Sequence, residues 1–378
     1  MDDFFMKLNG YEVVIIFGAA ELGRVIEGAI GEYCNDRGKL VCFADNSFQK
    51  WSDKVISPAE AHSRFPDALW IIASDMQRRL MLEDLDKIMV DRNNIVIDLP
   101  NDINLLKASY DKSIKLTARK TLHHLDYAVT YHCNLNCTGC NLYSPLVKAP
   151  RFAEIESFTK DMERLNCLLD GNLPGLTLLG GEPLLNPQIN DFLVVGRRHL
   201  PNTRIAVITN GILLAKMPEC FWRACNENNI HIIVTRYPMK LDYKAMESIA
   251  KSHDVVFGYA TGIEKTSWNI ALSPAGTHDC NDSFVNCFMS NKCAYLENGR
   301  IYPCSPVGRI EAFNEFFCTN MCVTQNDYVN IYQVGSSGEI LEFLSNPIPF
   351  CRFCNVRGRT YDTPWRTSKR EIGEWVIV

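Results

Sequence analysis

The 378-residue sequence has no long apolar run and no large excess of charge of either sign. No stretch approaches the ~18 apolar residues of a membrane helix. The chain opens with Met1-Asp2-Asp3 and no apolar core follows, so we expect no secretory signal peptide. Lys and Arg number 39 against 44 Asp and Glu, which gives a net charge of −5. These absences predict a cytoplasmic protein that binds neither nucleic acid nor membrane.

Cysteine is the residue that the sequence has in excess, with 16 in all. In a reducing compartment, clustered cysteines indicate a metal site or catalysis rather than disulfides. Cys133, Cys137 and Cys140 form a C-x3-C-x2-C loop directly after an apolar run. Three thiolates are one short of the four that complete a cubane cluster, so one iron stays open to a non-protein ligand. Structural zinc usually takes four protein ligands, and this loop has no fourth Cys or His at zinc-knuckle spacing.

This loop resembles the signature of radical S-adenosylmethionine (SAM) enzymes, and the resemblance covers about residues 121–280. Three further segments agree with it, in the right order. Gly-Gly-Glu-Pro at 180–183 and Thr-Asn-Gly at 209–211 each follow an apolar strand, and a third strand comes next at 230–235. The residue before the third cysteine is usually aromatic in that family and is Gly139 here, which affects the packing beside the adenine and not the cluster. The resemblance implies a 4Fe-4S cluster with an open iron that binds the amino and carboxylate groups of SAM.

The resemblance also implies an activity. One electron, from a flavodoxin- or ferredoxin-type reductant, cleaves SAM, and the 5′-deoxyadenosyl radical abstracts a hydrogen atom from a small-molecule substrate. The implied cofactor-binding residues are Gly180, Gly181, Glu182, Asn210, Thr235 and Arg236. The Glu182 carboxylate suits the SAM ammonium group, and the glycines admit a close approach. Glu182 could instead cap its loop, and Thr235 and Arg236 could cap their strand. No catalytic residue is identified.

The first block, residues 1–110, alternates strands and helices as a Rossmann-like parallel sheet does. The expected strands are 12–17, 40–44, 68–73 and 94–98, with a helix near 77–89. A glycine turn at 18–23 has Ala20 where a dinucleotide fingerprint has its second glycine, so we favour a module without NAD or FAD. The alternative is a nucleotide or nucleotide-sugar on the following helix, with Asp45 near a ribose. The block loosely resembles small domains attached to sugar-modifying enzymes.

The second block, residues 121–280, repeats strand and helix in a pattern that predicts a partial (β/α)6 barrel. Its expected strands are 125–130, 176–179, 205–208, 232–235, 255–259 and 268–272. Active sites of such barrels lie at the carboxyl ends of the strands, where each motif above falls. The fold class is therefore α/β.

The third block, residues 281–378, is predicted to be a small cysteine-rich α+β extension. Asn298-Gly299 between alternating runs predicts a two-residue hairpin turn, which puts Cys293 opposite Cys304. The block resembles the SPASM or twitch extension of radical SAM enzymes, without its full seven cysteines. One auxiliary 4Fe-4S cluster is implied, with four ligands from Cys287, Cys293, Cys304, Cys351 and Cys354. The choice between Cys287 and Cys293 stays open, and a zinc ribbon is the alternative.

These features together predict a radical SAM oxidoreductase that oxidises or otherwise modifies a sugar or nucleotide-sugar. In this interpretation the auxiliary cluster accepts an electron from the substrate radical. A peptide-modifying maturase is the first alternative, ranked second because residues 1–110 do not look like a winged-helix leader-binding domain. A non-catalytic iron–sulfur scaffold or sensor is the other.

Overall fold

The computed structural model divides the chain into two compact units, Met1–Thr117 with Val285–Phe288, and Ala118–Phe284 with Met289–Val378. The predicted three-block division stays a prediction. The residues that the structure describes are 8, 10–19, 23, 24, 26–28, 30, 39–48, 55–73, 78–96, 122, 124–260, 271–287, 289, 290, 294–359 and 364–377.

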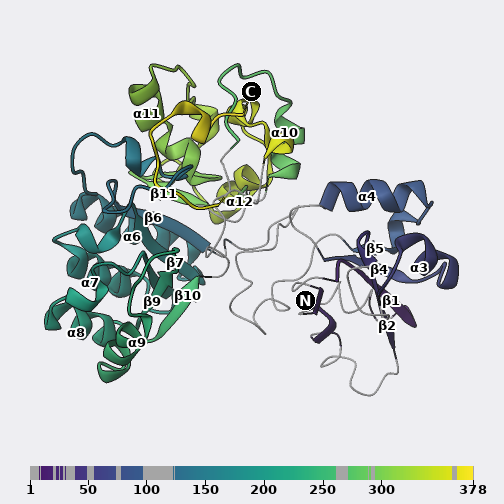
Figure 1. Cartoon of the computed structure of the whole chain (residues 1–378), viewed down its shortest axis with the longest axis horizontal. Coiled ribbons are helices and arrows are strands. Elements are labelled where there is room, and N and C mark those ends of the chain that lie inside the picture. Colours follow the sequence, from purple (N-terminus) through teal and green to yellow (C-terminus); the bar gives the residue numbers. More distant parts are fainter. Residues whose placement is uncertain are drawn as a thin grey trace. The chain divides into compact units, whose positions relative to one another are not determined.

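The N-terminal unit is built on a five-stranded parallel sheet in the order β3-β2-β1-β4-β5 (Figure 1). Its strands are β1 (Val13–Phe17), β2 (Leu40–Ala44), β3 (Val55–Ile56), β4 (Leu69–Ile72) and β5 (Ile95–Val96). Its described helices are α3 (Pro58–Arg64), α4 (Arg78–Lys87) and the 3-10 helix η2 (Arg92–Asn94). The predicted parallel sheet is confirmed, and the short strand β3 was not predicted.

Strand β1 contributes to two separate cores. Val14 and Ile16 belong to one cluster of buried apolar residues, and Ile15 and Phe17 belong to another. Successive side chains of a strand point to opposite faces, so a sheet buried on both faces has strands with unbroken apolar runs. The sequence Val-Val-Ile-Ile-Phe of β1 is such a run.

The second unit contains an eight-stranded sheet in the order β10-β9-β8-β7-β6-β11-β12-β13. Its strands are β6 (His124–Thr130), β7 (Gly175–Gly180), β8 (Arg204–Thr209), β9 (Ile230–Thr235), β10 (Phe257–Ala260), β11 (Tyr295–Glu297), β12 (Arg300–Tyr302) and β13 (Val329–Asn330). The connecting helices are α6 (Ile155–Leu169), α7 (Ile189–His199), α8 (Glu219–Glu227) and α9 (Tyr243–Ser252), with short turns η3 (Ser144–Leu146), η4 (Pro183–Leu185) and η5 (Leu214–Lys216).

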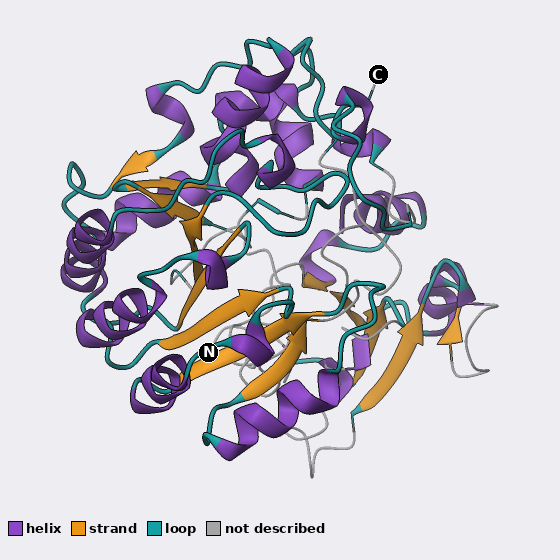
Figure 2. Ribbon diagram, turned by 60° about the vertical axis from the view of Figure 1, so that its left-hand side comes forward, coloured by secondary structure: helices purple, strands orange, loops and turns teal. Residues whose placement is uncertain are grey.

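Strands β6 to β10 are parallel and correspond to five of the six predicted barrel strands. Most of the sixth, 268–272, lies outside the described residues, although Leu272 forms bridges with Cys354 and Val376. Beyond β6 the sheet continues into β11, which also pairs in parallel. The predicted α/β class with parallel strands is confirmed, and Figure 2 shows helices lying along the strands.

The predicted hairpin forms at Asn298-Gly299. Strands β11 and β12 pair with Leu296 opposite Ile301, and the turn residues have φ of 49° and 74°. Two successive positive φ values are typical of the hairpin turn that Asn-Gly favours. The turn is tied to α6, because the Gly299 N–H donates to the buried Asp161 carboxylate at 3.1 Å.

The rest of the second unit is mostly helical. It comprises α10 (Cys280–Asn286), α11 (Ser305–Phe317), η6 (Gln325–Asp327), α12 (Ser337–Ser345), η7 (Pro349–Phe353), η8 (Val356–Gly358) and η9 (Ile372–Glu374). Together with β11 to β13 these elements agree with the predicted α+β character.

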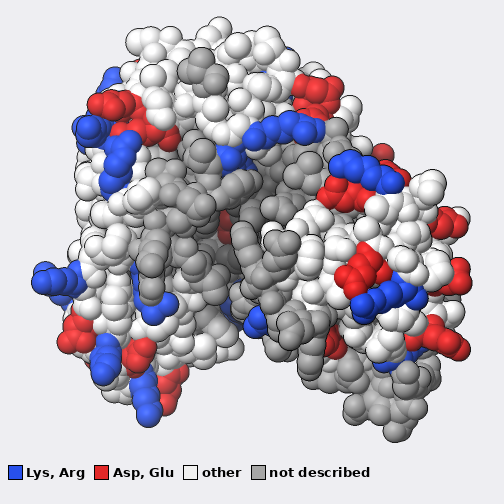
Figure 3. Space-filling model, turned by 45° about the vertical axis from the view of Figure 1, so that its right-hand side comes forward, with Lys and Arg blue, Asp and Glu red and all other residues white. Residues whose placement is uncertain are grey.

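Charges of both signs lie next to one another on the face drawn in Figure 3. A search of the described helices finds none with the length and apolar character that a bilayer crossing requires.

We predict that Gly299→Ala lowers the free energy of unfolding by about 1–2 kcal/mol, because a left-handed backbone strains any residue with a Cβ. That Cβ would also lie 2.4 Å from the Tyr332 ring. Gly335→Ala is the matched control, since its nearest contact is 3.5 Å away and its φ is not positive. Urea denaturation measures both, and equal stability of the two variants would contradict the prediction.

Candidate functional site

Cys133, Cys137 and Cys140 line one pocket beyond the carboxyl end of β6. The pocket has a volume of about 210 Å³, and the other walls include residues at the ends of β7, β8 and β9. Carboxyl ends of parallel strands lie at one edge of a sheet, which explains why loops distant in sequence meet there. The structure therefore brings the three predicted cluster ligands together.

The protein alone disfavours thiolates at all three positions. Burial is the largest cause that raises the pKa of each thiol, to about 11 for Cys137. The Cys140 sulfur raises the pKa of Cys133 and Cys137 further, because like charges repel. Three buried thiols that resist ionisation next to one another suit a cationic iron–sulfur core, which would compensate their negative charge. The residues present thus fit the implied cluster.

No three Cys, His, Asp or Glu side chains among the described residues converge on a point where a single ion could bind. A cubane does not require such convergence, because each thiolate binds a different iron. The arrangement of the three cysteines is compatible with a cluster on these grounds.

The glycine pair packs against the start of the cysteine loop. Gly181 donates its N–H to the Thr130 carbonyl at 2.8 Å, and a Cβ on Gly180 would lie 2.1 Å from the same oxygen. A Cβ on Gly181 would lie 2.0 Å from the His132 carbonyl. Gly180 also has a φ of 152°, which few other residues adopt. These glycines thus allow the backbone at 180–181 to approach the backbone at 130–132, immediately before Cys133.

Glu182 is fully buried and joins two strand ends. Its carboxylate accepts hydrogen bonds from the Leu184 N–H at 3.1 Å, the Thr209 hydroxyl at 2.7 Å and the Asn210 N–H at 2.9 Å. Burial raises the pKa of this carboxyl to about 7, although the three hydrogen bonds lower it. The side chain therefore caps η4 and positions two residues of the pocket wall, whereas its predicted contact with SAM stays a prediction.

Asn210 and Thr235 both line the pocket, as expected for SAM contacts. The Asn210 amide donates to the Asn134 side chain at 2.8 Å and approaches the Cys133 sulfur at 3.7 Å. The Arg236 guanidinium lies over the Tyr259 ring, 4.8 Å from its centroid, and Arg236 is not among the residues that line the pocket. Their roles toward SAM stay predictions.

Two aromatic residues of the pocket, Tyr237 and Trp365, were missed by the sequence analysis. Their ring centroids are 5.8 Å apart, and both side chains lower the pKa of the Cys137 thiol against the larger effect of burial. Tyr237 directly follows the end of β9, so its position could have identified it. Trp365 is far from any motif, and no local pattern points to it.

The predicted auxiliary ligands Cys304, Cys351 and Cys354 pack against the same core as the parallel strands. Cys304 precedes α11, and Cys351 lies in η7. The Tyr143 hydroxyl is buried without a hydrogen-bond partner among the described residues. Burial raises the pKa of that hydroxyl most, and the nearby thiols of Cys354 and Cys304 raise it further. A buried Tyr143 hydroxyl without a hydrogen-bond partner among the described residues, next to these thiols, is compatible with an iron–sulfur cluster bound at this place.

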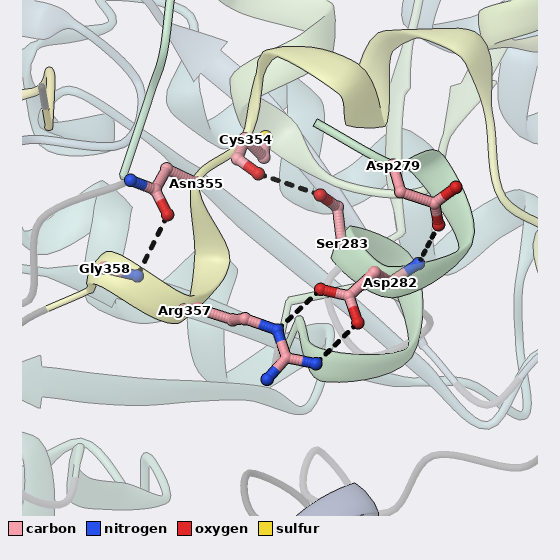
Figure 4. A network of polar contacts seen from close by, with 7 residues as sticks. All are labelled: Asp279, Asp282, Ser283, Cys354, Asn355, Arg357 and Gly358. Carbon is pink, nitrogen blue, oxygen red and sulfur yellow. Dashed lines mark hydrogen bonds and ion pairs between the residues drawn. The ribbon is translucent and has the colours of Figure 1, made fainter. Parts of the chain in front are cut away.

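Contacts with α10 hold the loop that carries Cys354 (Figure 4). The Ser283 hydroxyl donates to the Cys354 carbonyl at 2.8 Å, and Arg357 donates to both carboxylate oxygens of Asp282 at 2.7 Å each. Cys293 lies outside the described residues, so the pairing of Cys293 with Cys304 and the choice of the fourth ligand stay predictions.

In the N-terminal unit, the Asp45 carboxylate is engaged by backbone. It accepts hydrogen bonds from the Ala19 N–H at 3.0 Å and the Ser47 N–H at 2.7 Å. Gly18 has a φ of 116°, so the glycine turn begins as expected. The alternative of a nucleotide at the helix N-terminus, residues 22–24, stays a prediction, and Leu22 lies outside the described residues. Asp45 therefore shapes the turn after β1, and its predicted proximity to a ribose stays a prediction.

The family model of the radical SAM superfamily matches residues 127–257, which contain the cysteine loop and the pocket-lining strand ends. These residues form a domain of the radical SAM type. The match agrees with the resemblance of the C-x3-C-x2-C loop, and radical SAM proteins share a 4Fe-4S cluster and bound SAM.

Curated proteins that are similar to part of this chain include two bacterial GTP 3′,8-cyclases. The cyclase of Klebsiella pneumoniae subsp. pneumoniae is 28% identical over 175 residues, which cover 44% of this chain and 51% of that protein. The cyclase of Nautilia profundicola is 25% identical over 198 residues, which cover 49% of this chain and 59% of that protein. The chain thus spans about half the length of these relatives.

Similar solved structures include BtrN in complex with AdoMet and 2-DOIA, at 18% identity and a TM-score of 0.39, covering 62% of this chain and 94% of that one. Another is Streptococcus suis SuiB bound to the precursor peptide SuiA, at 13% identity and a TM-score of 0.34, covering 79% and 85%. Likeness at these TM-scores indicates no substrate for this chain.

We predict that Glu182 makes the stability of the iron-free, SAM-free protein depend on pH. The folded protein holds the Glu182 proton up to a pKa of about 7, whereas the usual value is 4.5. The stability that Glu182 contributes is therefore present below pH 4.5 and is lost as the pH rises to about 7. Between pH 4 and pH 8, the wild type should lose on the order of 3 kcal/mol relative to Glu182→Gln. Urea unfolding across this range measures the difference, and a constant difference would contradict the prediction.

Proposed function

We propose that this radical SAM enzyme binds SAM in the pocket lined by Cys133, Cys137 and Cys140 and oxidises a sugar or nucleotide-sugar. The observation that carries the proposal is that three half-buried cysteines line one pocket together with residues at the strand ends. When bound, the 4Fe-4S cluster supplies the electron that splits the SAM sulfonium into methionine and a 5′-deoxyadenosyl radical, which takes a hydrogen atom from substrate.

The residues of the pocket would bind SAM and keep water out, and none of them would react with the substrate. Leu135, Leu142, Leu179 and Ile208 give it apolar walls, which would keep water from a reactive radical. The hydroxyl groups of Thr209 and Thr235 and the amide of Asn210 are among the polar side chains of the pocket that could contact the SAM ribose or amino acid. Glu182 keeps Thr209 and Asn210 in position from behind the wall.

The auxiliary site would hold a second 4Fe-4S cluster on Cys304, Cys351, Cys354 and either Cys287 or Cys293. Loss of a hydrogen atom, an electron and a proton converts an alcohol into a ketone. In this reaction the adenosyl radical would take the hydrogen atom, a cluster held by these cysteines would accept the electron, and the proton would go to solvent. The buried Tyr143 hydroxyl beside Cys304 and Cys354 supports a bound group there.

A nucleotide-sugar is the substrate class that we favour. The curated relatives are named as GTP cyclases and so act on a nucleotide. In the N-terminal unit the strand order reverses at β1, between β2 and β4, and ligands of open parallel sheets bind at such a switch point. A flavodoxin- or ferredoxin-type reductant in the cytoplasm would supply the electron.

We predict about eight irons per chain after anaerobic reconstitution, and 5′-deoxyadenosine on addition of dithionite and SAM. Replacing Cys133, Cys137 and Cys140 by Ala should abolish this product and leave about four irons. The matched control replaces the exposed Cys167, Cys220 and Cys322 by Ala and should change neither. A wild-type protein that contains four irons together with zinc would contradict the predicted auxiliary cluster. A loaded cluster without SAM cleavage would favour a scaffold or sensor.

We also predict that nucleotide-sugars raise the melting temperature of the full-length protein, because a ligand that binds only the folded state stabilises it. A ligand at 100 times its Kd contributes about 2.7 kcal/mol. A panel of nucleotide-sugars, free sugars and peptides tests this by differential scanning fluorimetry. Stabilisation by a peptide and by no sugar compound would contradict the assignment and favour the maturase.

A further inference from the structure

The C-terminal strap, residues 364–377, lies against the cysteine loop. The Thr138 N–H donates to the Arg366 carbonyl at 3.0 Å, and the Ser368 N–H donates to the Asn136 carbonyl at 2.9 Å. These two hydrogen bonds flank an antiparallel bridge between Cys137 and Thr367. Backbone more than 200 residues downstream therefore forms a short β-pairing with the loop that carries the predicted cluster ligands.

The strap is fixed by its own contacts as well. The Glu374 carboxylate, whose side chain is 1% exposed, accepts hydrogen bonds from the Lys369 N–H at 2.7 Å and the Arg366 guanidinium at 3.3 Å. The Trp375 indole N–H donates to the Cys140 carbonyl at 2.9 Å. Leu272 and Trp375 are also joined by a backbone hydrogen bond of 2.9 Å. The strap thus contacts the cysteine loop at residues 136–138 and at Cys140.

The pairing puts a tryptophan of the strap opposite a glycine of the cysteine loop. Continued by two residues, the register of Cys137 with Thr367 brings Trp365 opposite Gly139, and both line the pocket. Gly139 has a φ of 61°, so a larger residue would be strained there. The space left beside Gly139 is available to an aromatic ring, and the Trp365 indole is the ring that borders it.

We propose that Trp365 is the aromatic wall of the SAM pocket and that its indole stacks on the adenine base, with the strap as the element that positions it. The proposal rests on the proposed function, since it assumes that SAM is the ligand of this pocket.

The Trp365 indole presents a flat aromatic face to the pocket, and adenine is the flat aromatic group of SAM. Base stacking on an aromatic side chain depends on the face of the ring and tolerates many bases. Trp365 interacts with the Cys137 thiol, whose pKa it lowers through a side-chain hydrogen bond, so the edge of the indole is engaged by that residue and the flat face of the ring is what remains for a ligand. Tyr237 flanks the ring at 5.8 Å, which leaves the adenosyl group to be held between an aromatic wall and the strand ends.

The test measures binding of SAM and of methionine to reconstituted full-length protein by equilibrium dialysis. Methionine carries the amino and carboxylate groups of SAM but no adenine. Trp365→Ala should weaken SAM binding about 10-fold or more and leave methionine binding and iron content unchanged. Trp365→Phe keeps a stacking face and should stay within about 3-fold of the wild type.

A second pair of variants tests the positioning role of the strap. Glu374→Gln should weaken SAM binding several-fold, because it disturbs the contacts that hold residues 366–369. The exposed Glu371→Gln is the matched control and should bind SAM as the wild type does.

Two results would overturn the inference. One is a Trp365→Ala protein that binds SAM as tightly as the wild type. The other is an equal loss of SAM and methionine binding, which would make Trp365 a support of the cluster instead of a contact with adenine. A wild type that binds no SAM would instead refute the proposed function, and the inference with it.

Discussion

A direct contact between two backbone turns determines the geometry of the candidate site. The N–H groups of Gly181 and Glu182 donate to the carbonyls of Thr130 and His132 at 2.8 and 3.1 Å, and no residue with a Cβ could replace Gly181 without moving one of the turns. The cysteine loop therefore leaves β6 at a fixed position. From the same turn Glu182 reaches Thr209, so the ends of β6, β7 and β8 form one connected unit around the pocket.

A second contact acts on the cysteine loop from the other side. The C-terminal strap pairs with the loop at Cys137, and Trp375 reaches the carbonyl of Cys140. The loop is thus held between a turn of the parallel sheet and the distant end of the chain. Three of the cysteines predicted for an auxiliary cluster, Cys304, Cys351 and Cys354, pack on the same hydrophobic core as the parallel strands and lie in the same unit as the cysteine loop.

Local patterns predicted much of this arrangement. Strands β6 to β9 are apolar runs that end at the motifs, and Asn298-Gly299 set the hairpin because that dipeptide favours two successive positive φ values. Strands β3 and β13 were missed, since two residues carry no periodicity. The sequence did not predict that Glu182 accepts hydrogen bonds from Thr209 and Asn210, because these residues lie at the end of another strand. Trp365 was missed because its position depends on a pairing between segments far apart in sequence.

The proposed function requires that the loop of Cys133, Cys137 and Cys140 holds a cubane whose open iron binds the amino and carboxylate groups of SAM. Electron–nuclear double resonance of the reduced enzyme, with SAM labelled with ¹⁵N at the amino group and ¹⁷O at the carboxylate, detects this binding. We expect hyperfine coupling of both labels to the cluster, and its loss when the three cysteines are replaced by Ala. A fully reduced, SAM-saturated enzyme without coupling from either label would contradict the claim.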